Sequence, residues 1–184
     1  MSHVDMAFDN SGWQFSLPHL TVLDASPPEV VEAAAAAGFG FAGIRLIPTM
    51  PGEAQHPMLD RSPMMRRTLA LMAETGVRVL DIEALWLRPD SDPRHYLKEL
   101  EAAGMLGARC VQVISADPDE SRVADTLAAF CEAARPFGLD MSFEFMLISQ
   151  IRTFDAALRI VRATGMPNAK LTIGSLHCFR CHTP

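Results

Sequence analysis

An acidic residue in the middle of an apolar run is the clearest candidate for chemistry in this sequence. The run reads Ser142-Phe143-Glu144-Phe145-Met146. If it forms a strand, its side chains alternate between two faces, so Glu144 points away from the face shared by Phe143 and Phe145. A buried charge without a partner is costly. We therefore expect a metal ion, an Arg or Lys side chain, or a substrate to meet the Glu144 carboxylate.

Two further acids, Asp81 and Glu83, fall in a run that alternates over residues 79–86. In a strand both carboxylates would lie on the same face. If this face turns the same way as Glu144, the acids suit a polar site at the mouth of a barrel. The alternative is that one of them faces a helix or a loop and pairs with an Arg.

His19 and Arg45 are candidates for contacts with a substrate. His19 falls near the end of the first strand-like run, and Arg45 lies inside the second. An imidazole or a guanidinium in such a position is able to donate hydrogen bonds to substrate oxygens. Each residue also has an ordinary structural alternative, which is a hydrogen bond or an ion pair within the fold.

The six residues from Gly38 to Gly43 match the G-x-G-x-x-G pattern of dinucleotide-binding proteins. In that pattern the glycines follow a strand and open a helix, so that the pyrophosphate lies at the helix N-terminus. Here they follow a helix-like run and open a strand-like run. We therefore interpret Gly38 as the end of a helix and assign no nucleotide site.

Residues 178–182 read C-F-R-C-H and match the attachment motif of c-type haem. Haem attachment normally takes an exported chain, and the N-terminal residues show no export signal. Together with His177, this segment offers ligands for adventitious binding of a transition metal, although a structural zinc site would need a second segment. The remaining alternative, which we favour, is that residues 178–184 form an irregular tail.

The candidate residues are set in a chain that alternates strand-like and helix-like runs. The strand-like runs fall at residues 15–23, 41–46, 77–86, 110–115, 141–146 and 170–176. From the second run onward they are about thirty residues apart, which is the length of a βα unit. Such alternation predicts a parallel sheet covered on both faces, or a closed α/β barrel.

Helix boundaries between these runs are marked by capping residues and proline. Pro27-Pro28, Ser62-Pro63 and Asp92-Pro93 are typical of helix starts. Gly76 is expected to end the second helix. A full eight-stranded barrel takes about 250 residues, so a chain of 184 residues holds about six of the eight units.

Composition excludes several classes of protein. A net charge of −6, with 49% hydrophobic and 21% charged residues, indicates one globular domain and argues against a nucleic-acid surface. No segment is long and apolar enough for a membrane span. Four cysteines are too few for a disulfide scaffold. We therefore expect a cytoplasmic protein with reduced thiols and no membrane or nucleic-acid partner.

Four segments together resemble a known family. They are residues 41–46 (FAGIRL), 80–83 (LDIE), 143–146 (FEFM) and 172–177 (TIGSLH), and in order and spacing they are similar to the xylose-isomerase-like sugar phosphate isomerase/epimerase family. The resemblance implies a parallel (β/α) barrel of the TIM type with a divalent metal, Mn, Mg, Zn or Co, at its C-terminal mouth. We therefore expect residues 1–184 to form a single barrel-like domain that lacks the last two βα units.

The resemblance also implies roles for individual residues. In this family an acid on strand five and an acid on strand six bind the metal together with a His and a Glu from the last two strands. Glu144 matches the first acid and would act as metal ligand and catalytic base. Gly174 occupies the position of the second acid, and the later His and Glu have no counterparts. His177 and Arg180 match residues that hold substrate, and Glu83 is a further substrate-binding candidate beside His19 and Arg45.

The expected function is that of a divalent-metal-dependent sugar or sugar phosphate isomerase or epimerase acting on a small sugar or polyol. One carboxylate cannot hold a cation that takes about six oxygen ligands, so we expect weak or no metal binding and an inactive isolated monomer. Three explanations stay open: a fragment of a longer enzyme, a natural short form that pairs its bare strand edges as a homo-oligomer, or a degenerate member.

A non-catalytic binding or assembly module on the same scaffold is the alternative function. A third function, an endonuclease of the same superfamily, is disfavoured by the acidic net charge.

Overall fold

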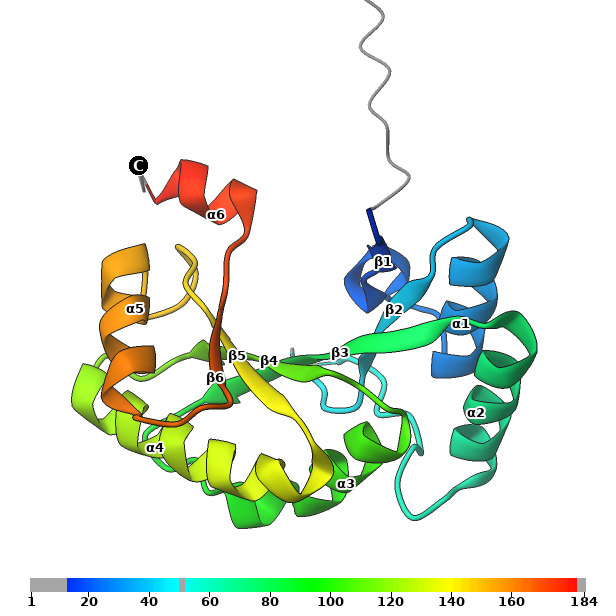
Figure 1. Ribbon diagram of the computed structural model, residues 1–184, viewed down its shortest axis with the longest axis horizontal. Helices are drawn as coiled ribbons and strands as arrows, with labels where there is room; N and C mark the ends of the chain where they lie inside the picture. Colours follow the sequence, from blue (N-terminus) through cyan, green and yellow to red (C-terminus); the bar gives the residue numbers. More distant parts are fainter. Residues whose placement is uncertain (1–12, 50–51, 182–184) are drawn as a thin grey trace, which may run out of the picture.

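Six parallel strands form one sheet, with the strands neighbouring one another in the order of the sequence. The structure is a computed structural model that describes residues 13–49 and 52–181. Figure 1 shows the sheet curving, with helices α1 to α5 along its outer side and β1 and α6 at its two ends. This is the predicted α/β architecture, a TIM-type barrel that is incomplete.

The strands are β1 (Ser16–Leu17), β2 (Phe41–Arg45), β3 (Arg78–Leu87), β4 (Cys110–Ser115), β5 (Asp140–Glu144) and β6 (Ala169–Thr172). The α-helices are α1 (Pro27–Ala36), α2 (Pro63–Thr75), α3 (Leu97–Met105), α4 (Glu120–Ala134), α5 (Phe154–Ala163) and α6 (Ser175–Arg180). Three short 3₁₀ helices are η1 (His19–Val22), η2 (Pro93–Tyr96) and η3 (Arg135–Phe137).

The predicted helix starts at Pro27 and Pro63 are confirmed, whereas Pro93 opens the 3₁₀ helix η2 and α3 begins only at Leu97. Ser26 and Glu29 form a reciprocal capping box in front of α1. The Ser62 hydroxyl accepts a hydrogen bond from the backbone N–H of Met65 at 3.1 Å and so caps α2. Gly76 then ends α2 in the left-handed conformation, with φ of 75°. These caps fix where α1 and α2 begin and where α2 ends.

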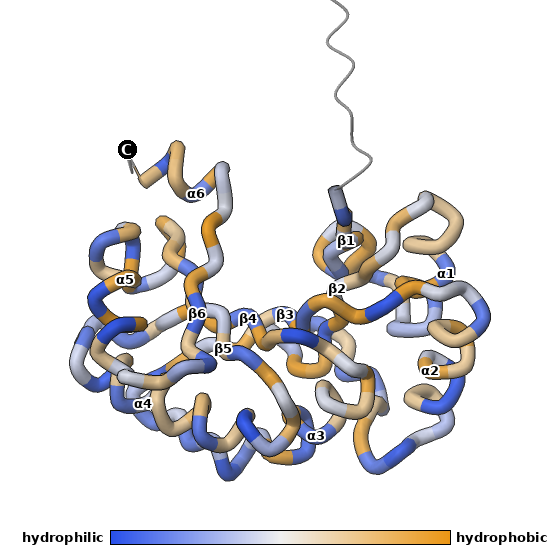
Figure 2. Tube along the Cα trace, in the orientation of Figure 1, coloured by the Kyte–Doolittle hydropathy of each residue, from blue (hydrophilic) through white to orange (hydrophobic). Residues whose placement is uncertain are grey.

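A hydrophobic core fills the space between the strands and the helices. Helix α4 buries an apolar stripe that recurs every three or four residues and includes Val123, Leu127 and Phe130, as its sequence predicts. Phe143 on β5 is fully buried as well. Figure 2 shows the helices alternating between hydrophobic and hydrophilic residues while the strands are richer in hydrophobic ones. Burial of this apolar surface drives the helices onto the sheet.

The end of the described chain differs from the prediction. Strand β6 stops at Thr172, whereas we expected a strand over residues 170–176, and residues 175–176 belong to α6. The register gives the reason: Thr172 pairs with Glu144, the last residue of β5, so residues beyond Thr172 have no neighbour in β5. Residues 178–180, which we expected to be irregular, are helical, and residues 182–184 lie outside the described residues.

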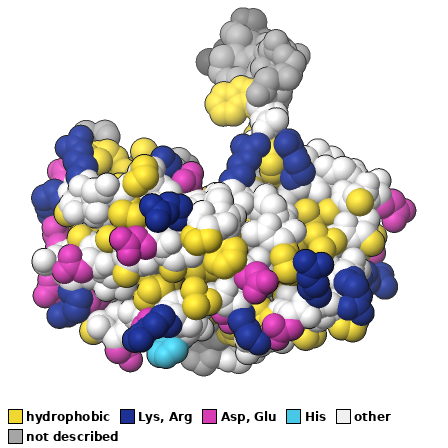
Figure 3. Space-filling view, turned by 60° about the horizontal axis from the view of Figure 1, so that its bottom comes forward, with side chains coloured by type: hydrophobic (Ala, Val, Ile, Leu, Met, Phe, Trp, Pro, Cys, Tyr) yellow, Lys and Arg dark blue, Asp and Glu magenta, His cyan; other side chains and the backbone are white. Residues whose placement is uncertain are grey.

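The surface carries charges of both signs. On the face in Figure 3, the described Lys and Arg side chains are interspersed with Asp and Glu side chains and with hydrophobic groups. Among the described residues, no helix is long and apolar enough to cross a membrane.

Candidate functional site

Three buried acids form a carboxylate row, which we define as Asp81, Glu83 and Glu144. Asp81 and Glu83 come from β3, and Glu144 is the last residue of β5. Their exposed fractions are 6%, 7% and 9%. Alternation along β3 puts Asp81 and Glu83 on one face, and the charge of Glu144 acts on Asp81 from β5. The charges of Glu83 and Glu144 therefore both act on Asp81.

Glu83 is anchored by main-chain and side-chain donors. Its Oε1 accepts a hydrogen bond from the backbone N–H of His19 at 2.9 Å, and its Oε2 accepts one from that of Leu20 at 3.3 Å. The Nε of Arg45 lies 3.6 Å from Oε2. Hydrogen bonds and an ion pair of this kind stabilise the charged form of a buried carboxylate. Glu83 thus pairs with an Arg, which is the structural alternative that the sequence left open. It nevertheless lies on the same face of β3 as Asp81.

The strand beside the row contributes a glycine for a steric reason. Gly43 on β2 pairs in register with Asp81 on β3. A Cβ atom at Gly43 would collide with Oε1 of Glu83 and lie 3.3 Å from Oδ1 of Asp81. A side chain at this position would therefore displace the Glu83 carboxylate from its donors.

Arg45 bridges two acids. Its Nη1 forms an ion pair with Glu53 and donates a hydrogen bond to the Thr49 hydroxyl at 2.9 Å. The backbone N–H of Thr49 in turn donates to Oε2 of Glu53 at 2.7 Å. With Glu83 on its other side, the guanidinium is held in place at the carboxyl end of β2.

His19 uses both ring nitrogens within the chain. Nδ1 accepts a hydrogen bond from the backbone N–H of Arg45 at 2.9 Å, and Nε2 donates to the carbonyl of Ala25 at 2.8 Å. These bonds fix the tautomer, and burial lowers the pKa of His19. The neutral ring therefore fastens η1 to β2. Its predicted contact with a substrate stays a prediction, and the ring face is the part left to make it.

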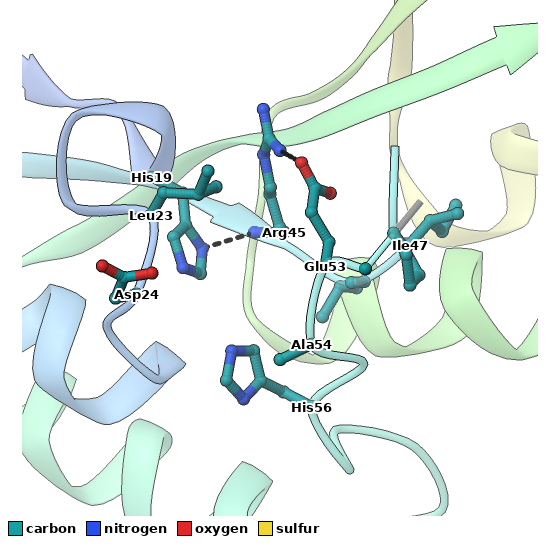
Figure 4. A pocket seen from close by; sticks show the side chains of 11 residues that line it. His19, Leu23, Asp24, Arg45, Ile47, Glu53, Ala54 and His56 are labelled. Atoms are coloured by element: carbon teal, nitrogen blue, oxygen red, sulfur yellow. Dashed lines mark hydrogen bonds and ion pairs between the residues drawn. The ribbon is translucent and has the colours of Figure 1, made fainter. Parts of the chain in front are cut away.

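A cavity of about 450 Å³ opens beside this network (Figure 4). It lies between residues 19–24, the end of β2 and residues 52–56. The ring of His56 is nearly parallel to that of His19, with the two centroids 6.1 Å apart. The lining thus combines imidazole rings, the carboxylates of Asp24 and Glu53, and the Arg45 guanidinium. Such a mixture of donors and acceptors suits a hydroxyl-rich small molecule.

Asp81 and Glu144 differ from Glu83 because no described Lys or Arg side chain pairs with them. Burial, and then the charges of Glu83 and Glu144, raises the pKa of Asp81 to about 7. Burial likewise raises the pKa of Glu144. These two groups have the physical properties of proton carriers, because a carboxyl with a raised pKa is able to hold a proton closer to neutral pH.

His177 meets Glu144 at the far end of the row. The Nε2 atom of His177 lies 3.9 Å from Oε1 of Glu144. A Cβ atom at Gly174 would lie 3.0 Å from that oxygen and 3.1 Å from Cδ2 of His177. The structure thus brings Glu144, Gly174 and His177 together. Arg180 is exposed near the end of α6 and makes no hydrogen bond or ion pair with a described residue.

The described residues do not supply a complete metal site. No group of three or more His, Cys, Asp or Glu side chains among them is arranged to hold a metal ion. Glu144 and His177 alone fall short of the six or so ligands that a hard divalent cation takes.

A sequential parallel sheet with helices along its outer side, buried acids on β3 and an acid at the carboxyl end of β5 is the architecture of an incomplete α/β barrel of the TIM type. Comparison with known proteins narrows this class. The family described as xylose isomerase-like TIM barrel matches residues 31–183, and the chain belongs to that family. No curated protein matches the chain.

Solved structures share the fold at low sequence identity. A xylose isomerase domain containing protein from Salmonella typhimurium LT2 has a TM-score of 0.72 and 16% identity, over 90% of this chain and 61% of its own. The IOLI protein with a bound zinc atom has a TM-score of 0.68 and 19% identity, over 90% and 64%. A D-psicose 3-epimerase in the presence of D-fructose has a TM-score of 0.70 and 11% identity, over 94% and 67%. The chain thus spans about two thirds of the length of these proteins.

Sequence reasoning missed the partners that hold the predicted residues. Thr49 and Glu53, which position Arg45, fall in a segment without a regular pattern. The same holds for His56 beside His19. The glycine at position 43 was visible, but its role depends on a carboxylate forty residues away in sequence.

We predict that Gly43→Ala destabilises the fold by about 1–3 kcal/mol, because the new methyl group must push Glu83 away from its donors. Gly40→Ala is the matched control, since a Cβ there meets no atom within 4 Å, and we expect a change within about 0.5 kcal/mol. Urea unfolding followed by circular dichroism measures both. Equal losses of unfolding free energy for the two variants would show that the absence of a side chain at position 43 is not needed to keep Glu83 in place.

The raised pKa of Asp81 predicts how stability depends on pH. The folded pKa of about 7 lies above the value of 3.8 for a free carboxyl, so the folded state keeps a proton that the unfolded state releases. Stability therefore falls as the pH rises from about 4 to about 7. Asp81→Asn removes this loss, and its advantage over the natural chain should grow across that range to a plateau on the order of 4 kcal/mol at most.

Urea unfolding midpoints at a series of pH values measure this dependence. The control for one lost charge is Asp125→Asn, at an exposed position on α4. A difference between Asp81→Asn and the natural chain that stays constant from pH 4 to pH 8 would contradict it.

Proposed function

We propose that this chain binds a small sugar or polyol at the carboxyl ends of its strands, and that its chemistry is the isomerisation or epimerisation typical of sugar-converting proteins. The observation that carries the proposal is the pair formed by Glu144 and His177, 3.9 Å apart, in which burial raises the pKa of the carboxyl group. Family membership and the likeness to a D-psicose 3-epimerase support the class of substrate.

Glu144 is the proton-handling group in this proposal. Epimerisation moves a proton from a carbon next to a carbonyl or hydroxyl group, which requires a base within hydrogen-bond reach. His177 and Arg180 hold substrate oxygens at this end of the carboxylate row. At the other end, Arg45 lines the cavity near His19 and is held in place by its ion pair with Glu83. Charged groups that are already held in place lose little entropy when a substrate binds.

Metal binding by the isolated monomer is expected to be weak or absent. The IOLI protein, which shares this fold, was solved with a bound zinc atom, and a divalent metal would supply a positive charge next to substrate oxygens. Within the described residues, Glu144 and His177 are the groups near such a position. The remaining ligands would have to come from outside the described residues, for example from water, from the substrate or from a second copy of the chain.

We also propose a homo-oligomer in a reducing, cytoplasmic compartment. Within the described residues, β1 and β6 are the outer strands of the sheet, and a strand edge without a neighbour readily pairs with another chain. All four cysteines are free thiols, as is usual in reducing compartments.

A non-catalytic binding or assembly module on this scaffold is the second candidate. It is favoured by Gly174, which offers no side chain where a second acid would stand beside Glu144. A binding module of this kind would also bind a sugar, but it would transfer no proton.

Deuterium exchange separates the two candidates. We expect the full chain, incubated with ketose sugars and a divalent metal in D₂O, to exchange a carbon-bound hydrogen of one sugar, as seen by proton NMR. Glu144→Gln should reduce the exchange at least about a hundredfold, because the amide cannot accept the proton. Sugar binding without any exchange, under conditions in which the chain is oligomeric and metal is present, would support the binding module instead.

Restoring an acid at position 174 tests the metal site. We expect Gly174→Asp to raise the affinity for Mn²⁺ by about tenfold or more, because a second carboxylate joins Glu144. Gly40→Asp adds the same charge far from Glu144 and serves as control. Native mass spectrometry counts subunits and bound metal together. A natural chain that binds metal stoichiometrically as a monomer would contradict the expectation of an incomplete site.

A further inference from the structure

Two cysteines stand on the last described turn of the chain. Cys178 lies in α6, and Cys181 caps the C-terminal end of this helix. Both are partly buried and pack against the hydrophobic core, whereas Phe179 between them is 82% exposed. Residues three apart on a helix lie on the same face, so the two thiols are neighbours on the side of α6 that faces the protein.

The spacing of these residues suits a disulfide after a small adjustment. Side chains three apart on a helix have Cβ atoms about 5–6 Å apart, whereas a disulfide needs about 3.5–4.5 Å. The last turn must therefore tighten by about 1–2 Å. Cys181 has φ of −89° and ψ of 10°, at the point where the chain leaves the helix. A terminal turn adjusts at lower cost than the interior of a helix, because fewer backbone hydrogen bonds depend on it.

The other two cysteines, Cys110 on β4 and Cys131 on α4, serve as internal references. Burial raises the pKa of the Cys110 thiol to about 11 and that of Cys131 to about 12. Both thiols therefore stay protonated at neutral pH, and the thiolate is the form that reacts. The Cys110 sulfur in addition lies 3.9 Å from the carbonyl oxygen of Leu80, within the hydrogen-bond range of a thiol.

We propose that Cys178 and Cys181 are a redox-active dithiol that a small-molecule disulfide oxidises to an intramolecular disulfide. One protein thiolate attacks a sulfur of the oxidant R–S–S–R, forms a mixed disulfide and releases one RS⁻. The second protein thiolate then attacks the protein sulfur of this mixed disulfide and releases the other RS⁻. The protein loses two electrons and two protons, and the oxidant becomes two molecules of RSH.

Oxidation of the two thiols would change the position of His177 at the candidate active site. The backbone N–H of Cys181 donates to the carbonyl of His177 at 2.8 Å, and that of Cys178 donates to the carbonyl of Gly174 at 2.9 Å. Tightening this turn therefore moves His177, whose Nε2 lies 3.9 Å from Glu144. The effect on activity rests on the proposed function, whereas the thiol chemistry does not depend on it.

The test starts from the reduced full chain, equilibrated with oxidised glutathione at pH 7.5, quenched with a maleimide and weighed by mass spectrometry. We expect a species that has lost two hydrogens and takes up no maleimide at Cys178 or Cys181. Cys110 and Cys131 should become labelled only after unfolding. Cys178→Ser and Cys181→Ser are the matched controls, and each should retain one glutathione, because no second thiol remains to expel it.

Three results would overturn the proposal: a disulfide that involves Cys110 or Cys131, a disulfide between two chains, or two thiols that stay reduced or glutathionylated at equilibrium. Proton NMR of the histidine rings then tests the link to the active site. The His177 signals should shift on oxidation while those of the exposed His95 stay in place. A disulfide that leaves His177 unmoved would confirm the dithiol and remove only its coupling to Glu144.

Discussion

Providing partners for the buried Glu83 carboxylate is the constraint on which the N-terminal half of this structure depends. A buried charge needs partners, and Glu83 finds them in two main-chain N–H groups of η1 and in the Arg45 guanidinium. Each partner imposes a further requirement. Arg45 needs Glu53 on its other side, and β2 needs a residue without a side chain at Gly43. The first two loops and β2 are therefore arranged around a single carboxylate.

The other two acids of the carboxylate row lack such partners, and this difference sets them apart from Glu83. Asp81 and Glu144 are as deeply buried as Glu83 but have no Arg or Lys partner within the described residues. A carboxyl group in such a place keeps its proton to higher pH or attracts a cation. Burying these two carboxyl groups lowers the stability of the fold, and positions that lower stability in this way are often functional. Glu83, which has its partners, is thus a structural member of the row, beside two acids that have no such partners.

The sequence was a good guide wherever a feature depends on near neighbours. Proline with a capping residue predicted the starts of α1 and α2, and the alternation of apolar residues predicted the strands β2 to β5. It was a poor guide wherever the outcome depends on a distant partner. The run from residue 170 to 176 has a strand-like pattern, yet β5 ends at Glu144 and leaves residues after Thr172 without a neighbour in that strand. The pairing of Glu83 with η1 joins residues 63 and 64 positions apart, which no local pattern reveals.

The same dependence on single positions explains why membership in the family does not settle what this chain does. Proteins with 11–19% identity keep the curved parallel sheet, because many different apolar residues fill a core equally well. A site is less tolerant. At the carboxyl end of β6, a Cβ atom at position 174 would stand 3.0 Å from Glu144 and 3.1 Å from the His177 ring, so this one side chain decides whether a second acid joins the first. With glycine there, the Glu144 carboxylate has the His177 ring, 3.9 Å away, as its neighbour instead of a second carboxylate.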